Sequence, residues 1–378
     1  MTDPAYVTLS RGIGPIAADR PTVKENAVFY VYSFLTNNYA YGGDIDYRKT
    51  FVLEQELPEG EPMKCLIDDP ATGKGAETKL MENDVLDFVN INIPYYYSQR
   101  NQEYKYNFFA YHIDDAEVKE GIVREKDNIH MDIKIDGTQD IITAAAGIKD
   151  KQLAEIDANN EKWFLSNVLN RELVFSTLTG HRFIIPVFEA KHQMSRFVFN
   201  LIGEDALSES IYIQDIYVMA HRDWNLTVAS DDISKLGMTM IGDREKLEKI
   251  HLCDEVGEVD GGKTNLEQYT YSVTQNELLA NLGLGLLLPP RNNYDLYIKC
   301  AQLRDGKEYR YIAHYALTNR TGAEDGTIVN NPFEAGRQYN VTMHVYGFQQ
   351  IQLSMDGLDW GTPIDIYIDE DDILDYIE

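Results

Sequence analysis

Strict alternation of apolar and polar residues is the dominant pattern along this chain. Apolar residues occupy every second position in 131–135, 341–345 and 351–355, with polar or charged residues between them. Because successive side chains of a strand point to opposite faces of a sheet, this period of two predicts half-buried strands. Similar stretches predict further strands at Tyr6–Ser10, Ala27–Leu35, Thr50–Leu57, Val85–Ile93, Tyr104–His112, Asp140–Ala145, Arg182–Phe188, Ser195–Ile202, Ile211–Met219, Tyr294–Leu303 and Tyr309–Leu317.

Helical periodicity is scarce by comparison. Apolar residues fall roughly at helical spacing within Asp150–Asn170, which predicts an amphipathic helix between two strand-rich halves. A second, shorter helix is predicted at Thr274–Leu282, where Thr274 would be the N-cap and Glu277 its capping-box partner. A few short helices in a mostly β protein are therefore expected.

The chain has 378 residues, more than the roughly 100–200 residues of one typical domain. Its predicted strands are short and separated by glycine-containing turns, a combination that favours a sandwich or barrel over a parallel α/β sheet. We therefore expect an all-β protein of the sandwich or barrel kind with two domains, residues 1–160 and residues 161–378, whose boundary lies within Ile148–Glu172.

Composition narrows the possible partners. The formal net charge is -28, which repels nucleic-acid phosphates and anionic membrane surfaces, so no nucleic acid is expected as a partner. Solubility is the favoured explanation of this charge, and a specific cation-binding role is the alternative. The three cysteines are too far apart in sequence for a metal cluster, and Cys300 is predicted to be a small core residue. No run of 18 apolar residues exists, so no transmembrane segment is expected.

No motif supports a catalytic or cofactor site. The segment ending in Gly75 resembles a P-loop, but Asp68 stands where the first glycine is needed and Gly75 where Ser or Thr would hold magnesium. His181 and His192 could share a metal, although edge-of-strand histidines are commoner. Adjacent carboxylates are expected by composition among 62 acidic residues, so they do not indicate a glycosidase. We expect no enzyme activity and no cofactor.

Several stretches, in order, resemble the fimbrillin family of Bacteroidales surface pilins. Tyr104–Asp115 resembles the family's aromatic strand, and Gly137–Ala144 its following strand. Ser195–Phe199 resembles a strand of the second half, although one extra residue separates Phe188 from His192. His192 itself is expected to point to solvent or to a backbone carbonyl.

The most extensive resemblance lies near the end of the chain, at Phe333–Gly347, followed by Asp359 and Trp360. The matches together span about residues 104 to 360. The resemblance implies two β-sandwich domains of transthyretin-like, Greek-key topology. It also implies a fimbrial subunit that is exported as a lipoprotein precursor, attached by a lipid anchor, displayed at the outer membrane and partnered by other pilin subunits. The signal segment is expected to be absent from this sequence.

Pilins of this family are trimmed at the N-terminus, which opens a groove for a donor strand of the next subunit. The removable strand would here consist of Tyr6, Val7, Thr8, Leu9 and Ser10. Candidate cleavage sites are Arg11 and Arg20, of which Arg11 is favoured because Pro21 follows Arg20. The alternative is an ordinary first strand and loop. Candidates for the donor strand lie in Pro363–Glu378.

Two alternatives to a fimbrial or adhesive subunit stay open at this stage. A non-catalytic glycan-binding module would use exposed aromatics such as Tyr95, Tyr96 and Tyr97 to stack on sugar rings. A β-sandwich hydrolase would need two carboxylates across a cleft. A host or bacterial surface receptor or glycan is a further possible partner of an adhesive subunit.

Overall fold

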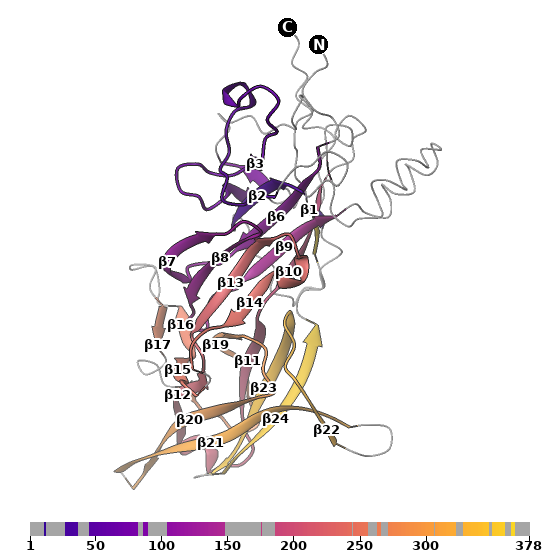
Figure 1. Ribbon diagram of the computed structural model, residues 1–378. Coiled ribbons are helices and arrows are strands. Elements are labelled where there is room, and N and C mark those ends of the chain that lie inside the picture. The colour runs from indigo at the N-terminus through magenta and orange to yellow at the C-terminus, as the bar shows by residue number, and fades with distance from the viewer. Residues whose placement is uncertain are drawn as a thin grey trace.

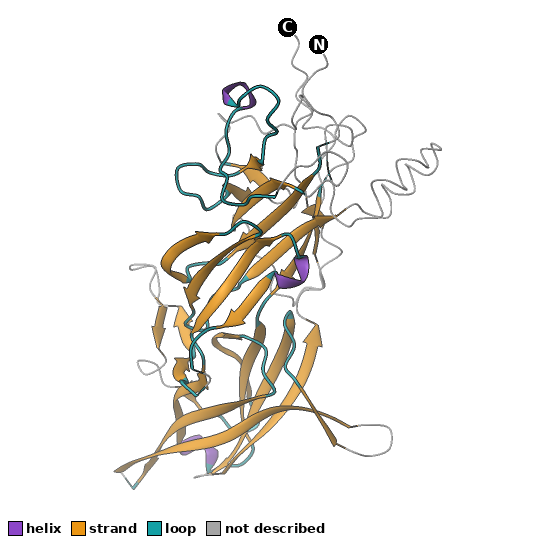
Figure 2. Ribbon diagram, viewed as in Figure 1, coloured by secondary structure: helices purple, strands orange, loops and turns teal. Residues whose placement is uncertain are grey.

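The computed structural model describes residues 11–12, 27–36, 45–81, 86–89, 104–147, 175, 186–243, 245–255, 263–265, 271–305, 307–322, 328–347, 350–359 and 364–366. Strands form nearly all of its regular structure, as Figure 2 shows. The helical elements among the described residues are short 3-10 turns: η1 (Glu54–Glu56), η3 (Ser208–Ser210) and η4 (Ile233–Lys235). The predicted all-β class is confirmed.

The largest sheet has nine strands from both ends of the sequence. They are β1 (Arg11–Gly12), β2 (Val28–Leu35), β3 (Cys65–Ile67), β4 (Ala76–Leu80), β5 (Leu86–Phe88), β6 (Tyr106–His112), β9 (Ile142–Gly147), β10 (Val187–His192) and β25 (Ile364–Ile366). Their order is β1-β25-β10-β9-β6-β2-β4-β5, with β3 also paired to β2. β1 therefore lies at one edge of this sheet, next to β25 (Figure 1).

A four-stranded sheet completes the first core. It consists of β7 (Glu117–Arg124), β8 (Asn128–Lys134), β13 (Asp223–Ser230) and β14 (Gly237–Met240), in the order β14-β13-β8-β7. Alternate residues of β8, such as Met131 and Ile133, pack in one buried cluster with Phe108 and Phe109 of β6. The period-two pattern of 131–135 therefore places the apolar side of β8 against the nine-stranded sheet.

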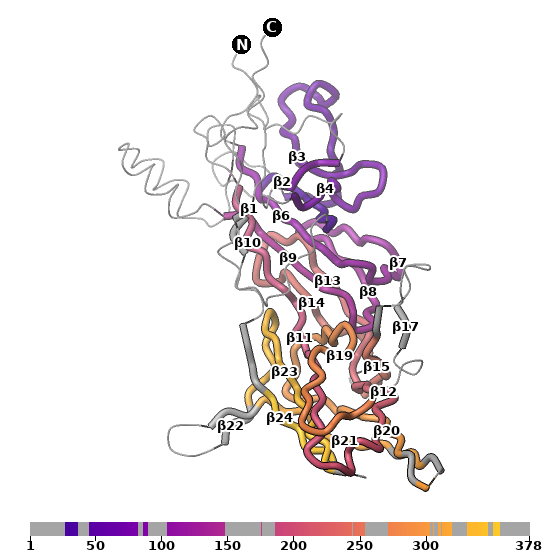
Figure 3. Tube along the Cα trace, turned by 180° about the vertical axis from the view of Figure 1, so that it is seen from behind, coloured from indigo at the N-terminus to yellow at the C-terminus, as the bar shows by residue number. Residues whose placement is uncertain are grey.

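The second core lies between two further sheets, at the end of the molecule away from β1 and β25 (Figures 1 and 3). One sheet has the order β19-β11-β23-β24, and the other has the order β15-β12-β20-β21-β22 with β18 paired to β12. Their strands are β11 (Ser195–Gly203), β12 (Ile211–Ala220), β15 (Glu248–His251), β18 (Tyr271–Ser272), β19 (Leu278–Leu288), β20 (Asn293–Arg304), β21 (Lys307–Gly322), β22 (Ile328–Asn331), β23 (Arg337–Gly347) and β24 (Gln350–Asp359). A separate pair is formed by β16 (Cys253–Glu255) and β17 (Lys263–Asn265).

The second core contains aromatic residues from those stretches of the second half that resemble fimbrillins. Phe197 stacks on Tyr339 with ring centroids 5.5 Å apart, and it meets Phe333 edge to face at 4.9 Å. β11 and β23 run parallel, and they pair Phe197 with Tyr339 although the two residues are far apart in sequence. Cys300 is fully buried in the same cluster, which confirms its predicted role as a small core residue.

The division of the chain into residues 1–160 and 161–378 remains a proposal, with one refinement from the topology. β10, β13 and β14 follow residue 160, yet they pair with β9 and β8 in the sheets of the first core. β25, from the end of the chain, also joins the nine-stranded sheet. The second segment therefore contributes strands to the first core.

Two predicted elements are wrong. Thr50–Leu57 contains the turn η1 and no strand. Thr274–Leu282 is not a helix, because Leu278 begins the strand β19, which pairs with β11. Gly283 in this strand has φ +57°, and a Cβ there would lie 2.5 Å from the carbonyl oxygen of Cys253. Pairing with β11 and left-handed backbone within β19 thus override the local capping pattern. The predicted helix Asp150–Asn170 lies outside the described residues.

Candidate functional site at the edge of the nine-stranded sheet

The edge strand β1 and the strand beside it come from opposite ends of the sequence. Arg11 pairs with Ile366 and Gly12 with Asp365, both in antiparallel register. On its other side β25 pairs with β10, through Asp365 with Glu189 and Ile364 with Ala190. The candidate cleavage site at Arg11 and the described part of the candidate donor segment, Ile364–Ile366, are therefore neighbours in one sheet.

β10 connects this edge to the rest of the sheet. It pairs with β9 along all six of its residues, from Val187 to His192. Phe188 and Ala190 are buried in the first core. Among the described residues, two pairs join β1 to β25 and two join β25 to β10. β10 therefore connects this edge to the first core.

The structure locates only part of the predicted site. Tyr6, Val7, Thr8, Leu9, Ser10 and Arg20 lie outside the described residues, as do Tyr95, Tyr96 and Tyr97 of the glycan-binding alternative. Of the proposed donor segment, Ile364–Ile366 is described, and it forms β25. Trp360, part of the family-like ending, also lies outside the described residues.

A histidine–carboxylate network fixes the end of the sheet near β10. Nδ1 of His192 lies 2.9 Å from Oδ1 of Asp140. The backbone N–H of Asp140 donates to Oδ2 of Asp114 at 2.9 Å, and the other oxygen of Asp114 lies 3.0 Å from Nε2 of His112. Nδ1 of His112 lies 2.8 Å from the carbonyl oxygen of Val28, so the network links β2, β6, β9 and β10.

His192 was expected to point to solvent or to a backbone carbonyl, and the first of these alternatives is wrong. Its side chain is 3% exposed, and its partner is the carboxylate of Asp140. In the first half, the spacing of His112 and Asp114 at the end of an aromatic strand was a usable local signal, because a carboxylate two residues after a buried histidine can turn back to it. The contact between His192 and Asp140 spans 52 residues of sequence, and no local pattern indicates it.

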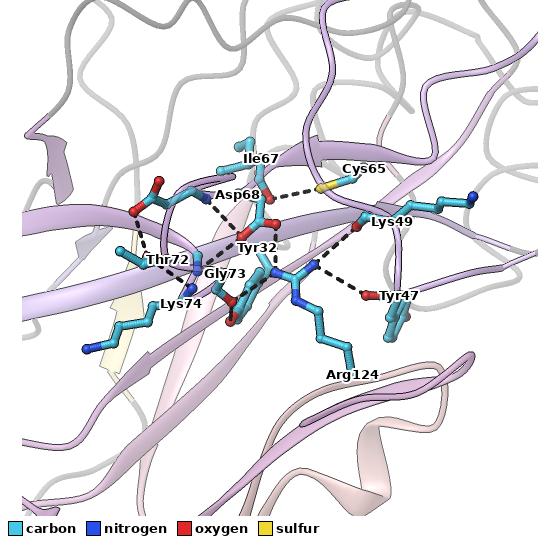
Figure 4. Close-up of polar contacts among 12 residues, drawn as sticks. Tyr32, Tyr47, Lys49, Cys65, Ile67, Asp68, Thr72, Gly73, Lys74 and Arg124 are labelled. Atoms are coloured by element: carbon cyan, nitrogen blue, oxygen red, sulfur yellow. Dashed lines mark hydrogen bonds and ion pairs between the residues drawn. The ribbon is translucent and has the colours of Figure 1, made fainter. Parts of the chain in front are cut away.

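A buried ion pair organises the opposite part of the nine-stranded sheet (Figure 4). Nη2 of Arg124 lies 2.6 Å from Oδ2 of Asp68, whose side chain is fully buried. The guanidinium also donates to the carbonyl oxygens of Gly73 at 2.9 Å and Lys49 at 3.2 Å. It lies over the ring of Tyr32, 5.4 Å from the centroid. These contacts satisfy the buried charges with fixed partners from three segments.

Burial raises the pKa of Asp68, while the nearby Arg124 and backbone N–H groups act to lower it. Oδ1 of Asp68 accepts from the N–H groups of Asp69 at 2.8 Å and Gly75 at 3.2 Å. Gly75 has φ +88°, and a Cβ there would lie 2.9 Å from the carbonyl oxygen of Val31. The segment that resembles a P-loop is therefore a loop that closes around the ion pair of Asp68 with Arg124. Its polar groups form hydrogen bonds with that ion pair, which agrees with the absence of the P-loop motif residues.

No group of three His, Cys, Asp or Glu side chains is arranged to hold a metal ion within the part of the chain that the structure describes. His181, one of the two histidines considered for a metal, lies outside that part. Among the described residues, no helix is long and apolar enough to cross a membrane.

Comparison with known proteins gives low similarity throughout. No family model matches the sequence, and no curated protein matches it. A candidate cell adhesion protein from Bacteroides ovatus has a similar structure, with 9% identity, a TM-score of 0.43 and coverage of 94% of this chain and 96% of that chain. One from Parabacteroides distasonis has 9% identity, a TM-score of 0.38 and coverage of 94% and 96%.

The fimbrial anchor protein Mfa2 from Porphyromonas gingivalis has 11% identity, a TM-score of 0.31 and coverage of 94% of this chain and 98% of that chain. Each of these similarities extends over nearly the whole length of both chains. At such TM-scores and identities, the likeness carries no argument about fold or function.

Proposed function

We propose that the chain is a structural or adhesive subunit of a cell-surface fimbria that assembles with other pilin subunits by strand addition after N-terminal trimming. In this proposal the protein is a lipid-anchored or fimbrial component of the outer membrane surface. The resemblance of residues 104 to 360 to fimbrillins motivates it. The observation that carries it is the edge of the nine-stranded sheet, where the described residues of β1, Arg11 and Gly12, pair with β25 from the other end of the sequence.

The energetics of this edge support an exchangeable strand. Two adjacent pairs in an antiparallel ladder share about two backbone hydrogen bonds. Each contributes roughly 0.5–1.5 kcal/mol net, so the two pairs between the described residues of β1 and β25 contribute about 1–3 kcal/mol. Detachment of β1 would leave the N–H and C=O groups of β25 unpaired on that side. Such an open edge can accept a strand from another subunit, with backbone hydrogen bonds for affinity and alternate side chains for specificity.

Cleavage after Arg11 would break the peptide bond between the two paired residues of β1. The bond must leave the ladder to enter a trypsin-like protease, and β1, the last strand in the order of this sheet, can detach without breaking the pairing of β25 with β10. We therefore expect limited trypsin digestion of the native protein to cut at Arg11, or at Arg20 in the alternative. The cut site is identified by mass spectrometry, and the assembly state by size-exclusion chromatography.

The matched controls are Arg11→Ala, Arg20→Ala and the double variant. Oligomers that form after a single N-terminal cut, and that fail to form when the relevant arginine is replaced, would support a polymerising pilin. Cleanly trimmed protein that stays monomeric at high concentration would contradict strand addition. Resistance of the native protein at both arginines would contradict N-terminal trimming as the trigger.

A further inference from the structure

A serine, a histidine and a glutamate form a connected row on the second half of the protein, far in sequence from the edge described above. Oγ of Ser354 lies 2.9 Å from Nε2 of His344. Nδ1 of the same ring lies 2.6 Å from Oε1 of Glu204. A carboxylate accepts hydrogen bonds only, so Nδ1 carries the proton and Nε2 is free to accept the hydroxyl hydrogen of Ser354. This is the order of contacts in a nucleophile–base–acid triad.

Three strands position these side chains. His344 lies on β23, Ser354 on the neighbouring β24, and Glu204 directly follows β11 on the other side of β23. The backbone N–H of Glu204 donates to the carbonyl oxygen of Val345 at 2.8 Å, which continues the parallel pairing of β11 with β23. Met343 and Val345 point into the second core, so His344 faces the outer side of the sheet. The pairing register of the three strands therefore brings these side chains together, and it places them at the surface.

The groups beside the triad have the chemistry of an ester site. Thr342 pairs with Ser354 on one side and with Asn200 on the other. Oδ1 of Asn200 accepts from the backbone N–H of Asn281 at 3.0 Å, and its Nδ2 donates toward Oγ1 of Thr342 at 3.5 Å. A hydroxyl and an amide donor thus share a row with Ser354. On the adjacent row, Ile202 pairs with both His344 and the exposed Leu278, which offers an apolar surface to a short acyl group.

We propose that Ser354 and His344 are the nucleophile and general base of a hydrolytic site for small carboxylic esters, and that Glu204 is a positioning residue for His344. This departs from the sequence-based expectation that the chain is not an enzyme, and it does not depend on the proposed fimbrial role. A polar cross-strand network of this kind otherwise adds only about 0.2–1 kcal/mol per pair to stability. A network that contributed only to stability would not need one ring nitrogen of the histidine to contact a carboxylate and the other to contact a hydroxyl.

The proposed hydrolysis requires only the ester, water and the side chains of Ser354, His344 and Glu204. Oγ of Ser354 attacks the ester carbonyl carbon while its proton passes to Nε2 of His344, and Glu204 stabilises the resulting imidazolium. The bond to the alcohol oxygen breaks, and that oxygen takes the proton from Nε2. Water then attacks the acyl carbon and transfers a proton to Nε2. Release of the carboxylic acid returns the proton to Oγ of Ser354.

The test uses the full chain and two probes, a fluorophosphonate and p-nitrophenyl acetate. The fluorophosphonate forms a bond between Oγ and phosphorus with loss of fluoride, so mass spectrometry can locate the label. We expect labelling at Ser354, and ester hydrolysis above the buffer rate. Ser354→Ala should remove the label, and His344→Gln should lower labelling and hydrolysis by about 10²–10⁴-fold.

Matched variants separate the proposal from a structural role. Ser234 is an exposed serine whose Oγ lies 2.6 Å from a carboxylate oxygen of Asp232, and Ser234→Ala should leave labelling and hydrolysis unchanged. Glu204→Gln should lower kcat and alter its pH profile with little change in KM. Thermal unfolding of each variant checks that it is folded. Wild-type protein that is unlabelled at Ser354, or that hydrolyses the ester at the rate of folded Ser354→Ala, would overturn the proposal.

Discussion

Replacement of Arg124 by methionine is expected to destabilise the fold by about 3–5 kcal/mol, because it leaves the carboxylate of Asp68 buried without its cationic partner. The side chain of Asp68 is 0% exposed and that of Arg124 is 13% exposed, so water cannot replace the lost guanidinium without opening the loop. Methionine keeps much of the apolar volume of the arginine stem. The predicted loss therefore comes mainly from the charge and its hydrogen bonds.

The destabilisation caused by Arg124→Met has an upper limit. Asp68 retains the N–H donors of Asp69 and Gly75, which stabilise the charge that remains, so the cost should not exceed the upper part of the range. The assay is equilibrium unfolding in urea, with the free energy extrapolated to water. The double variant Asp68→Asn with Arg124→Met should be more stable than Arg124→Met alone, because it no longer buries an unpaired charge.

An exposed ion pair provides the control. Arg48 lies 2.7 Å from Asp46, but its side chain is 58% exposed, so Arg48→Met should leave stability nearly unchanged. Arg124 lowers the pKa of Asp68, and its removal lets burial raise that pKa further. The destabilisation by Arg124→Met should therefore shrink as the pH falls and the carboxyl becomes neutral. A cost below about 1 kcal/mol at neutral pH would refute the reasoning, since a buried unpaired carboxylate is more costly than that.

Two further predictions concern stability. Burial lowers the pKa of His112, but the hydrogen bond and charge of Asp114 more than offset this, so its folded pKa is raised. The contribution of His112 to stability should be complete below about pH 6.5, the usual pKa of histidine, and it should be lost as the pH rises through the folded pKa. Melting temperatures measured from pH 5 to 8 should show this loss in the wild type and not in His112→Gln. Gly283→Ala should lower the free energy of unfolding in urea more than Gly60→Ala does. Both glycines have positive φ, but of the two only Gly283 would place a Cβ against a backbone oxygen, that of Cys253 at 2.5 Å. Equal losses of stability would contradict this close approach.

Strands whose apolar residues alternate with polar ones could be predicted from sequence. β8, β23 and β24 lie within or around the alternating stretches, because each has one face on a core and one toward solvent. β4 was missed although it also alternates, since Ala76 and Thr78 are weak signals for its buried face. β19 was assigned to a helix because a local capping pattern precedes it, whereas its pairing with β11 is set by a partner about 80 residues away.

The candidate sites depended still more on long-range contacts. The carboxylate of Asp68 and the guanidinium of Arg124 meet across 56 residues of sequence, and Glu204 meets His344 across 140. Sequence patterns report the face and period of a strand, but they do not report which strand lies beside it. Arg11 as a cleavage site and Pro363–Glu378 as a source of the donor strand were each expected from the family resemblance. That Arg11 lies beside Ile366 depends on the pairing of β1 with β25, which no local pattern indicates.

Acceptance of a strand from another subunit at this edge is tested most directly by peptide binding. The full chain, which keeps β25, would be studied before and after trypsin trimming, with a fluorescent peptide of residues 363–378 and a scrambled peptide as control. The trimmed protein should bind the peptide stably, while the scrambled peptide should not bind and the untrimmed protein should bind much more weakly. Equal binding before and after trimming, or no binding after clean trimming, would contradict it.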